Sequence, residues 1–368
     1  MRLRNRIIGA LVLLLAAGLG LGALALRHDS PCAASPVFAG QAASMQAIVH
    51  RCYGPPAVLR YEDIPRTAPG EHEVQVRVHA ASVNPLDWHY LRGAPYVVRL
   101  DSGVGAPTNP RLGVDFSGTV AAVGAGVTRF KPGDEVFGGK MGAFAQYVNV
   151  RDDRAIVLKP ANVTFEQAAA VPIAAITALQ ALRDKGRIQA GQKVLINGAS
   201  GGVGTFAVQI AKAYGAEVTG VCSTRNLEMV RALGATQVID YTQEDFTKGS
   251  QHFDLILDTV GNHSLLEYRR VLNPHGTFVI VGGPSDGNWV GPLMTPLKAL
   301  LLRPFVSQKF LPFLAELNQQ DLSVLGELMQ TGKLTSAIDR RYPLRDVAAA
   351  LAYLEQGHAR GKVVIDVE

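Results

Sequence analysis

Stretches in which apolar residues recur at every second position dominate residues 45–165. The clearest is EVQVRVHAASV at residues 73–83, which has the period of a strand with one buried face. Residues 116–124 and 144–150 have similar patterns, and KPGDEVFGG at 131–139 has the residues of a turn between strands. These patterns predict a compact β-barrel.

The pattern changes in the second half of the chain, where strands and helices alternate. Residues 164–186 are helical in composition, with Thr164 as N-cap and Gly186 as stop. Strand-like and helix-like segments then follow in turn at 193–198, 202–216, 217–222, 226–235, 237–241, 253–261 and 276–283. Short apolar strands with helices between them indicate a parallel sheet covered on both faces. We therefore predict an α/β fold with a Rossmann domain over 166–310 and a C-terminal segment over 311–368.

An uninterrupted apolar run of 20 residues, Ile7 to Leu26, lies near the N-terminus. With a rise of about 1.5 Å per residue, a helix of this length spans roughly 30 Å, the thickness of a bilayer's hydrocarbon core. We predict that residues 1–26 form a hydrophobic helix that anchors the chain in a membrane through residues 7–26, with a cleaved signal peptide as the alternative. Residues 27–44, rich in Ala, Ser and Pro, are interpreted as a flexible linker.

Charge and cysteine content narrow the function classes. The net charge is +5 and the basic residues are scattered without a Lys/Arg block, so no nucleic-acid partner is expected. The three cysteines, Cys32, Cys52 and Cys222, show no paired spacing. We therefore predict neither a disulfide framework nor a metal knuckle.

A glycine-rich turn, NGASGGVG at residues 197–204, lies between a predicted strand and a predicted helix. Its residues match the dinucleotide-binding pattern G-x-G-x-x-G with alanine in the first place. In that pattern the first residue makes a tight turn, the second admits the pyrophosphate and the third lets the helix pack on the strand. The helix N-terminus supplies free N–H groups. The cofactor-binding residues predicted in this turn are Ala199, Ser200, Gly201, Gly202, Val203 and Gly204.

The residues after the second strand of this domain indicate which dinucleotide binds. A site for NAD usually has an Asp or Glu about 20 residues after the turn, where it binds the ribose hydroxyls. Ser223, Thr224 and Arg225 stand there instead. A guanidinium and hydroxyls suit the 2′-phosphate of NADPH, which an acid would repel. NADPH is therefore the predicted cofactor, with Ser223 and Arg225 on its 2′-phosphate and Tyr241 at its adenosine end.

The predicted cofactor affects the prediction of the side of the membrane on which residues 45–368 lie. Three arginines precede the apolar run and one follows it, which favours residues 45–368 on the outer side. That side normally lacks NADPH, whereas the glycine turn is intact. Both orientations stay open here, with a slight lean to the cytoplasmic face.

Several stretches together resemble one family over about residues 45–368. They are ASVNPLDWHYLRG, LGVDFSGTVAAVG, FKPGDEVFG, VPIAAITALQAL, NGASGGVG, DTVG and HARGKVVI. Through them the chain is similar to the zinc-independent quinone oxidoreductase (zeta-crystallin-like) branch of the medium-chain dehydrogenase/reductase family. The resemblance implies a GroES-like β-barrel catalytic domain over 45–165 and a Rossmann NADP-binding domain over 166–310. It also implies that segment 311–368 returns to the catalytic domain, with the active site in the cleft between the domains.

The family's zinc branch has ligands that this chain lacks. A Cys stands there at the place of Asn84, and a His-Glu pair follows the place of Gly113, where this chain has Val114 and Asp115. A tetrahedral zinc site needs nitrogen and sulfur ligands, so we predict no metal. Hydride transfer to an electron-poor acceptor is then the natural chemistry. We predict an NADPH-dependent quinone reductase for a small hydrophobic acceptor; the alternatives are an enone or enoyl-thioester reductase and a non-catalytic NADPH-binding scaffold.

The resemblance implies further site residues. Those assigned to the cofactor are Asn84, Thr177, Val260, Gly282, Gly283 and Lys362. Asn84 should lie near the nicotinamide amide and also face the substrate. Tyr90 and Tyr96 are the candidate proton donors, although neither falls at the family's usual spacing. Asn84, Tyr90 and Tyr96 are therefore the predicted catalytic residues.

Residues 288–314 form a long apolar segment. It is consistent with a hydrophobic acceptor channel, with contact to lipid, or with a core or dimer segment. A homodimer is therefore a possible assembly.

Overall fold

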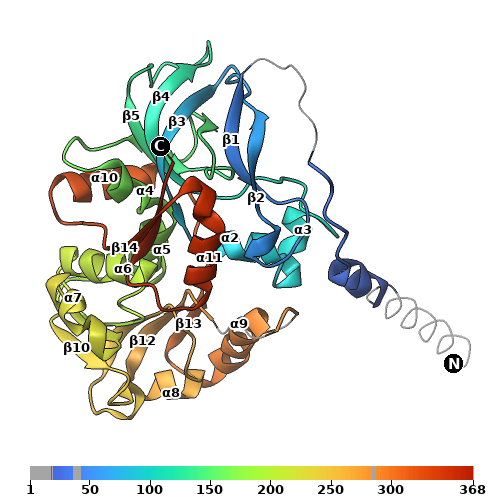
Figure 1. Cartoon of the computed structure of the whole chain (residues 1–368). Helices are drawn as coiled ribbons and strands as arrows, with labels where there is room; N and C mark the ends of the chain where they lie inside the picture. Colours follow the sequence, from blue (N-terminus) through green and yellow to red (C-terminus); the bar gives the residue numbers. More distant parts are fainter. Residues whose placement is uncertain (1–17, 19, 36–42, 284–286, 290, 368) are drawn as a thin grey trace, which may run out of the picture.

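The computed structural model describes residues 18, 20–35, 43–283, 287–289 and 291–367. Figure 1 shows a large sheet in the upper half of the view and another in the lower half, with helices around the lower one. The chain crosses from the first sheet to the second and returns to the first near its C-terminus. The predicted α/β class is confirmed.

The first sheet has seven strands in the order β14-β15-β3-β4-β5-β7, with β6 paired to β3. The strands are β3 (Glu73–Val83), β4 (Asp115–Val123), β5 (Glu135–Gly139), β6 (Tyr147–Arg151), β7 (Ile156–Leu158), β14 (Ile338–Pro343) and β15 (Lys362–Asp366). A two-stranded sheet pairs β1 (Ser44–Val49) with β2 (Arg60–Pro65). Val74, Val76 and Val78 of β3 are buried in the core of this domain, as the alternation predicted.

The stretch predicted as a turn over residues 131–139 is a turn only in its first part. Its end, Glu135–Gly139, is strand β5, which pairs with β4 and β7. The N–H of Asp134 donates to the carbonyl oxygen of Lys131, which closes the turn one residue before the strand. The strand was not predicted because EVFGG contains two glycines, and glycine is uncommon in sheets.

Two helices of the catalytic domain were not predicted, α2 (Pro85–Arg92) and α3 (Arg99–Ser102). Asn84 and Asp87 form a capping box at the start of α2, and the helix ends at Gly93, whose φ of 56° is left-handed. This capped start holds the backbone of Asn84 in a defined position.

The second sheet is parallel, with six strands in the order β10-β9-β8-β11-β12-β13. The strands are β8 (Lys193–Asn197), β9 (Glu217–Cys222), β10 (Gln237–Asp240), β11 (Phe253–Asp258), β12 (Leu272–Ile280) and β13 (Lys309–Pro312). The helices of this half are α6 (Gly202–Ala213), α7 (Leu227–Ala232), α8 (Leu265–Arg270) and α9 (Gly291–Leu302). The predicted Rossmann sheet is confirmed, whereas strand β13 was not foreseen.

The helix predicted over residues 164–186 is broken into three pieces. They are α4 (Phe165–Ala169), α5 (Pro172–Gln180) and a π-helical turn (Ala181–Lys185). The break lies before Pro172, which has no N–H to continue the ladder and fits the first turn of a new helix. Thr164 caps α4 in a capping box with Gln167, as the sequence predicted for its N-terminus.

The C-terminal segment returns to the first sheet through α10 (Gln319–Gln330), β14, α11 (Val347–Glu355) and β15. Strand β15 pairs antiparallel with β3, which places Val363 opposite Val83. Just before β15, the N–H of Gly361 donates to the carbonyl oxygen of Ser200 at 2.8 Å. The return of the chain therefore connects the catalytic sheet to the glycine turn. The boundaries predicted between the domains stay predictions.

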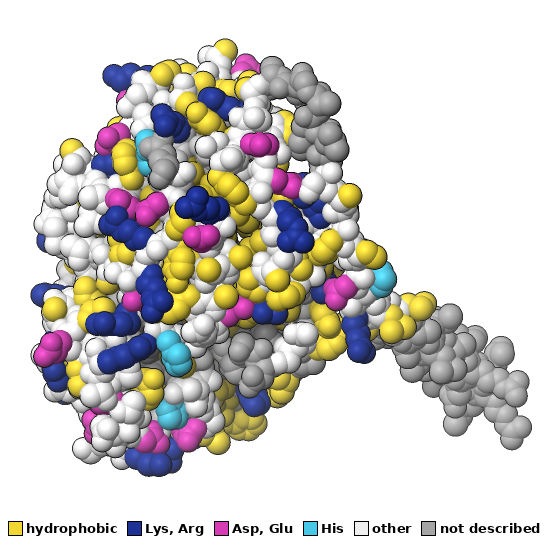
Figure 2. Space-filling view, viewed as in Figure 1, with side chains coloured by type: hydrophobic (Ala, Val, Ile, Leu, Met, Phe, Trp, Pro, Cys, Tyr) yellow, Lys and Arg dark blue, Asp and Glu magenta, His cyan; other side chains and the backbone are white. Residues whose placement is uncertain are grey.

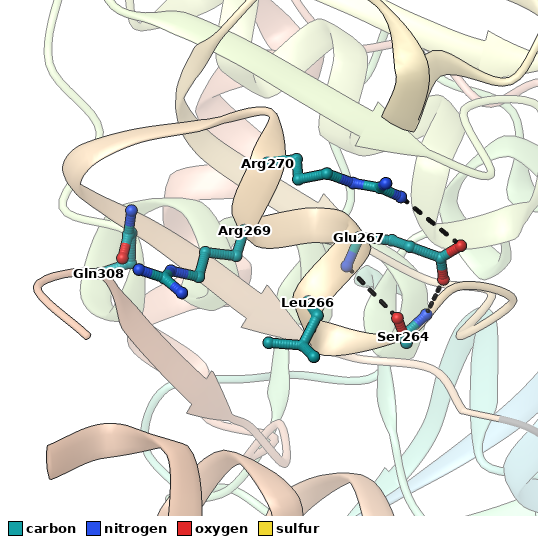
Figure 3. A pocket seen from close by; sticks show the side chains of 6 residues that line it. All are labelled: Ser264, Leu266, Glu267, Arg269, Arg270 and Gln308. Atoms are coloured by element: carbon teal, nitrogen blue, oxygen red, sulfur yellow. Dashed lines mark hydrogen bonds and ion pairs between the residues drawn. The ribbon is translucent and has the colours of Figure 1, made fainter. Parts of the chain in front are cut away.

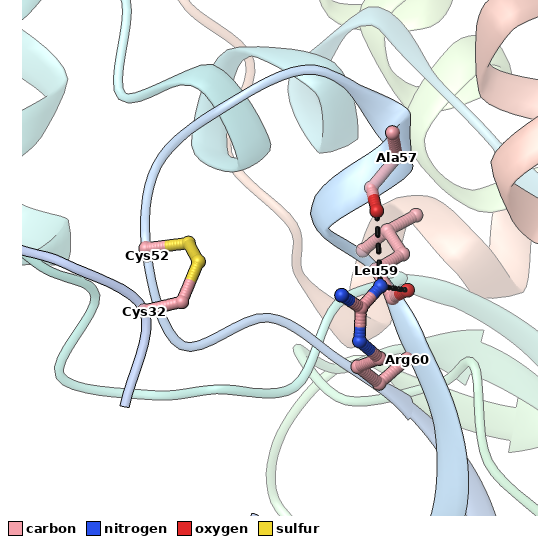
Figure 4. Close-up of a disulfide and its surroundings, with 5 residues drawn as sticks. All are labelled: Cys32, Cys52, Ala57, Leu59 and Arg60. Atoms are coloured by element: carbon pink, nitrogen blue, oxygen red, sulfur yellow. Dashed lines mark hydrogen bonds between the residues drawn. A yellow bond between two sulfur atoms is a disulfide. The ribbon is translucent and has the colours of Figure 1, made fainter. Parts of the chain in front are cut away.

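The N-terminal part differs from the prediction in one covalent feature. Cys32 and Cys52 form a disulfide, with 4.6 Å between their Cα atoms (Figure 4). The sequence analysis, which predicted no disulfide framework, missed this bond, because sequence spacing does not reveal which distant segments the fold brings together. The loop that follows Cys52 is held by Arg60, whose Nη1 donates to the carbonyl oxygens of Ala57 and Leu59.

The described part of the predicted linker is fixed to the catalytic domain. The N–H of Ser30 donates to the carbonyl oxygen of Gly105 at 2.8 Å, and Asp29 pairs with Arg99 at 2.7 Å. Residues 28–35 are thus not a flexible tether; residues 36–42 lie outside the described residues.

The predicted membrane helix falls mostly outside the described residues. Residues 20–27 are helical, and residues 1–17 and 19 are not described. Within the described part of the chain, no helix is both long and apolar enough to cross a membrane.

Candidate functional site

The glycine turn lies between β8 and α6. Gly198, which the sequence analysis passed over, has a φ of 84° and makes the tight turn, while Ala199 is fully buried behind it. A side chain at Gly204 would collide with the carbonyl oxygen of Gly198, so glycine here permits close helix packing. A β-carbon at Gly201 would come within 4 Å of that carbonyl oxygen alone, at 3.4 Å. The backbone of Gly201 is therefore open to a ligand.

Asn226 joins the glycine turn to the end of β9. Its Nδ2 donates to Ser200 Oγ and to Ser223 Oγ, both at 3.1 Å. Asn226 is 4% exposed, and its Oδ1 has no partner among the described residues. Sequence reasoning missed this residue as part of the site, because an Asn before a helix is normally only a cap.

Arg225 and Thr224 are held by segments distant in sequence. The Nη2 of Arg225 donates to the carbonyl oxygen of His358 at 2.6 Å, in the loop before β15. The Thr224 hydroxyl donates to Asp240 Oδ2 at 2.5 Å, and this bond lowers the pKa of the Asp240 carboxyl. An acid thus does lie beside the β9 end, but it comes from β10. Tyr241 follows it and is exposed.

The predicted cofactor residues of this half share one edge of the sheet. The glycine turn follows β8, Ser223 and Arg225 follow β9, and Tyr241, Val260 and Gly282 follow β10, β11 and β12. The carboxyl ends of parallel strands are where ligands of doubly wound sheets bind. A side chain at Gly282 would collide with the carbonyl oxygen of Thr259, whereas Gly283 faces open space.

A buried polar cluster from the catalytic domain lies against this edge. The Nζ of Lys362 donates to Asn84 Oδ1 at 2.5 Å and to the carbonyl oxygen of Val83 at 3.3 Å, and it lies 3.4 Å from Asp115 Oδ2. Lys362 is 3% exposed. Burial lowers the pKa of its ammonium, and Asp115 opposes that effect. The structure therefore brings together two predicted site residues, Lys362 and Asn84.

Asp115 organises the cluster, and the sequence analysis did not list it among the site residues. Its Oδ2 accepts from Asn84 Nδ2 at 2.8 Å and from Ser82 Oγ at 2.9 Å. Its Oδ1 accepts from the N–H of Ile173 in α5 at 3.0 Å. One turn later, the hydroxyl of Thr177 donates to the Ile173 carbonyl at 2.7 Å. Asp115 thereby joins Asn84 to the helix that carries Thr177.

Asp87 lies behind Asn84. Its Oδ2 accepts from the N–H of Asn84 at 2.7 Å, and its Oδ1 has no partner among the described residues. Complete burial is the largest effect on this carboxyl and raises its pKa to about 7. Asp87 therefore exchanges a proton near neutral pH.

The two tyrosines predicted as proton donors are engaged elsewhere. The Tyr90 hydroxyl donates to Asp101 Oδ2 at 2.7 Å, and burial raises its pKa to about 12. The ring of Tyr96 lies edge-on to Trp289, with 4.7 Å between ring centroids. None of the contacts described for either tyrosine reaches Asn84 or Lys362, so their proton-donor role stays a prediction.

A surface hollow of about 750 Å³ lies away from these residues, beside α8 (Figure 3). It is lined by Ser264, Leu266, Glu267, Arg269, Arg270 and Gln308. Ser264 and Glu267 form the capping box of α8, so their polar groups are satisfied within the helix end. The hollow contains none of the predicted cofactor residues. Among the described residues, no group of three His, Cys, Asp or Glu is arranged to hold a metal ion.

Comparison with known proteins identifies the family. Residues 70–161 match the family described as "Alcohol dehydrogenase GroES-like domain", and residues 233–365 match the family described as "Zinc-binding dehydrogenase". The Mus musculus protein named "NAD(P)H oxidoreductase RTN4IP1, mitochondrial" is 36% identical over 337 residues, covering 80% of this chain and 82% of the relative. The chain belongs to the medium-chain dehydrogenase/reductase family.

Solved structures agree with this assignment. A quinone oxidoreductase from Coxiella burnetii is 34% identical, with a TM-score of 0.76 over 89% of this chain and 100% of its own. The Escherichia coli quinone oxidoreductase complexed with NADPH is 27% identical, with a TM-score of 0.75 over 88% of this chain and 100% of its own. The predicted pairing of a GroES-like domain with a Rossmann domain is confirmed.

Proposed function

We propose that the protein is an NADPH-dependent oxidoreductase that transfers a hydride to a quinone-like acceptor without zinc. The observation that carries this proposal is the position of Lys362. Its alkyl chain lies beside Gly202 of the glycine turn, with Cδ 3.3 Å from where a β-carbon would stand, and its ammonium bonds Asn84. One buried side chain thus links the turn proposed for the pyrophosphate to the residue proposed for the nicotinamide. Quinone oxidoreductases among the relatives support the same reaction.

The residues present fit NADPH. The backbone N–H groups of residues 201–203 begin α6, where the helix dipole favours a pyrophosphate. Ser223 and Arg225 would hold the 2′-phosphate through charge-assisted hydrogen bonds, with Tyr241 at the adenosine end. The Oδ1 of Asn226 is buried and has no partner among the described residues, so it can accept a hydrogen bond from a ribose hydroxyl. Thr177, Val260, Gly282 and Gly283 would flank the nicotinamide.

The chemistry divides between cofactor and protein. NADPH, when bound, supplies the hydride. The buried Nζ of Lys362 donates a hydrogen bond to Asn84, and Asp115 holds the amide of Asn84 in one orientation. Groups fixed in this way before an acceptor arrives stabilise charge that develops on it without having to reorganise.

Steady-state oxidation of NADPH with a panel of quinones, enones and enoyl thioesters tests the proposal. We expect turnover of quinones, faster with NADPH than with NADH. Turnover of enones or enoyl thioesters alone would assign the protein to that class of reductase. NADPH binding without turnover of any acceptor would instead support a non-catalytic scaffold.

We also propose that residues 7–26 anchor the chain in a membrane. Their apolar length supports this proposal. The arginine distribution and the Cys32–Cys52 disulfide favour an oxidising outer compartment, while the predicted NADPH site favours the cytoplasmic face. A C-terminal topology reporter in membrane fractions decides the side. A full-length chain that stays in the soluble fraction would refute the anchor.

A further inference from the structure

Helix α9 and the turn after it expose large apolar side chains. Leu300 and Leu301 are 63% and 64% exposed, and Phe305 is 79% exposed. Met294, Leu297 and the preceding Trp289 are also exposed. A soluble protein rarely places so many large apolar residues together without a partner.

A second set of exposed apolar residues lies where the N-terminal helix meets the catalytic domain. Leu21 and Leu24 belong to the helix at residues 20–27, and Leu100 belongs to α3. All three are exposed, Leu100 by 71%. Figure 2 shows apolar side chains around the point where this helix leaves the body of the protein and others along the lower edge, near α9.

A chain of contacts joins the two sets. The Nη1 of Arg99, a buried residue, donates to the carbonyl oxygens of Leu26 and His28 at the end of the N-terminal helix. The guanidinium of Arg99 lies 4.7 Å from the ring centroid of Tyr96. The ring of Tyr96 contacts Trp289, two residues before α9. The N-terminal helix and α9 are therefore held on the same side of the molecule, as Figure 1 shows.

We propose that these residues form one face that rests on a lipid bilayer. We call it the apolar face: Leu21, Leu24, Leu100, Trp289, Leu300 and Phe305, together with Met294, Leu297 and Leu301 of α9. The argument for lipid is continuity, because the 20-residue apolar run Ile7–Leu26 reaches this face through residues 20–26. A segment long enough to span a bilayer brings the surface around its end into contact with that bilayer.

The charges around α9 fit a membrane surface. Lys298 is the one charged residue in the sequence of α9, and it is exposed. It lines a hollow of about 400 Å³ between α8 and α9 together with Leu266 and Leu302. An ammonium above apolar side chains is the arrangement that meets lipid phosphates while the leucines enter the acyl region. Trp289 and Tyr96 are residue types enriched at that boundary.

This contact deepens the proposed function and rests on it. Gly282, proposed beside the nicotinamide, lies nine residues before Gly291, the first residue of α9, in the sequence. The acceptor class is therefore a lipophilic quinone dissolved in the bilayer, rather than a water-soluble one.

Tryptophan quenching tests the contact without using activity. The chain has two tryptophans. In the full-length protein reconstituted in vesicles of phosphatidylcholine and phosphatidylglycerol, Trp88→Phe leaves only Trp289, and Trp289→Phe leaves only Trp88. Lipids brominated near the headgroup should quench Trp289 and not Trp88, since the latter packs against the core of the catalytic domain. Equal quenching of the two, or none of Trp289, would overturn the proposal.

A second experiment tests the acceptor. The double variant Leu300→Glu/Phe305→Glu should lower kcat/KM for a long-chain quinone in the vesicles by about tenfold, through lost apolar contact. Turnover of a short-chain, water-soluble quinone should not change. Leu158→Glu, on β7 of the catalytic domain and also exposed, is the control and should change neither rate.

Other results would have distinct meanings. Equal losses with both quinones in the double variant would overturn the inference about the acceptor. Conversion of a dimer to a monomer by Leu300→Glu/Phe305→Glu, measured by light scattering in detergent, would assign the face to a second copy of the chain. If the native protein reduces neither quinone, the proposed function fails, while the quenching result still decides the membrane contact.

Discussion

At the scale of single residues, Arg225 carries the predicted choice of cofactor. Arg225→Ala should remove most of the preference for NADPH over NADH, on the order of 1.5–3 kcal/mol for a hydrogen bond to a charged group. The measurement is the Kd of both cofactors by fluorescence titration. Arg231→Ala, an exposed arginine of α7, is the control. Equal affinities of the native protein for the two cofactors would refute the assignment.

Asp87 predicts a pH dependence of stability. Its pKa is about 7 when folded, and an unperturbed Asp has a pKa of about 3.9. Between these pH values only the folded state retains the proton, so the free energy of unfolding falls as pH rises through this window. Asp87→Asn should flatten the profile by about 1.4 kcal/mol per unit of pKa difference, measured by urea unfolding at pH 4 to 8. An unchanged slope would contradict this; the exposed Asp63→Asn serves as control.

The absence of zinc is also a prediction about residues. Asn84 and Val114 stand where the zinc branch has ligands, and the amide of Asn84 is already bonded to Asp115 and Lys362. The purified protein should contain no stoichiometric zinc, and NADPH oxidation should survive dialysis against a chelator. Elemental analysis that finds about one zinc per chain would show the prediction to be wrong.

The sequence reveals a site residue when a recognisable motif marks its position. Asn84 and Lys362 were found through the family resemblance of the motifs around them, and the structure brings them into contact. Asp115 and Asn226 were missed because an acid in a strand and an Asn before a helix usually have local roles. Their partners here are Asn84 and Ser200, which only the tertiary fold brings close.

At the scale of elements, substitutions at two glycines of one turn should have different effects, one on the free energy of unfolding and the other on NADPH binding. Gly204→Ala forces α6 away from the carbonyl oxygen of Gly198 and should lower the free energy of unfolding by about 1–3 kcal/mol. Gly201→Ala meets little protein, so it should spare stability and weaken NADPH binding instead. Gly326→Ala, in α10 with its nearest contact at 3.9 Å, should be neutral or stabilising.

Urea unfolding and cofactor titration of the same three variants check this division. If Gly201→Ala binds NADPH like the native protein, the turn does not hold the pyrophosphate. If Gly204→Ala is as stable as the native protein, the packing argument for that glycine is wrong.

Local sequence patterns predicted the long regular elements. They failed for elements that depend on pairing or packing with another part of the chain. Strand β3 was evident because its alternation matches its buried face. Strand β13 was not, because it is a four-residue edge strand that exists through pairing with β12. Pro172 broke a predicted helix that composition alone made continuous. Pairing and packing are properties of the folded chain, which periodicity does not report.

At the scale of the whole molecule, the N-terminal segment is fixed to the catalytic domain by the Cys32–Cys52 disulfide. The protein has one further cysteine, Cys222, which is buried. Under denaturing conditions without reductant, one thiol should react with a maleimide, and three should react after reduction. Three reactive thiols without reductant, in protein purified from its native compartment, would show that the disulfide does not form there.

The Cys32–Cys52 disulfide should also stabilise the fold. Its effect on stability therefore helps to test the compartment in which the protein resides. It joins residues 20 apart, and closing a loop of that size is worth about 3 kcal/mol in the chain-entropy model. Cys32→Ser/Cys52→Ser should therefore lower the free energy of unfolding by about that amount under oxidising conditions only. Disulfides persist outside the reducing cytosol. If the bond stabilises the protein in this way, we therefore expect a C-terminal topology reporter to be active on the outer side of the membrane. A native protein equally stable with and without reductant, and a reporter active only inside, would instead place the enzyme on the cytoplasmic face, where NADPH is available.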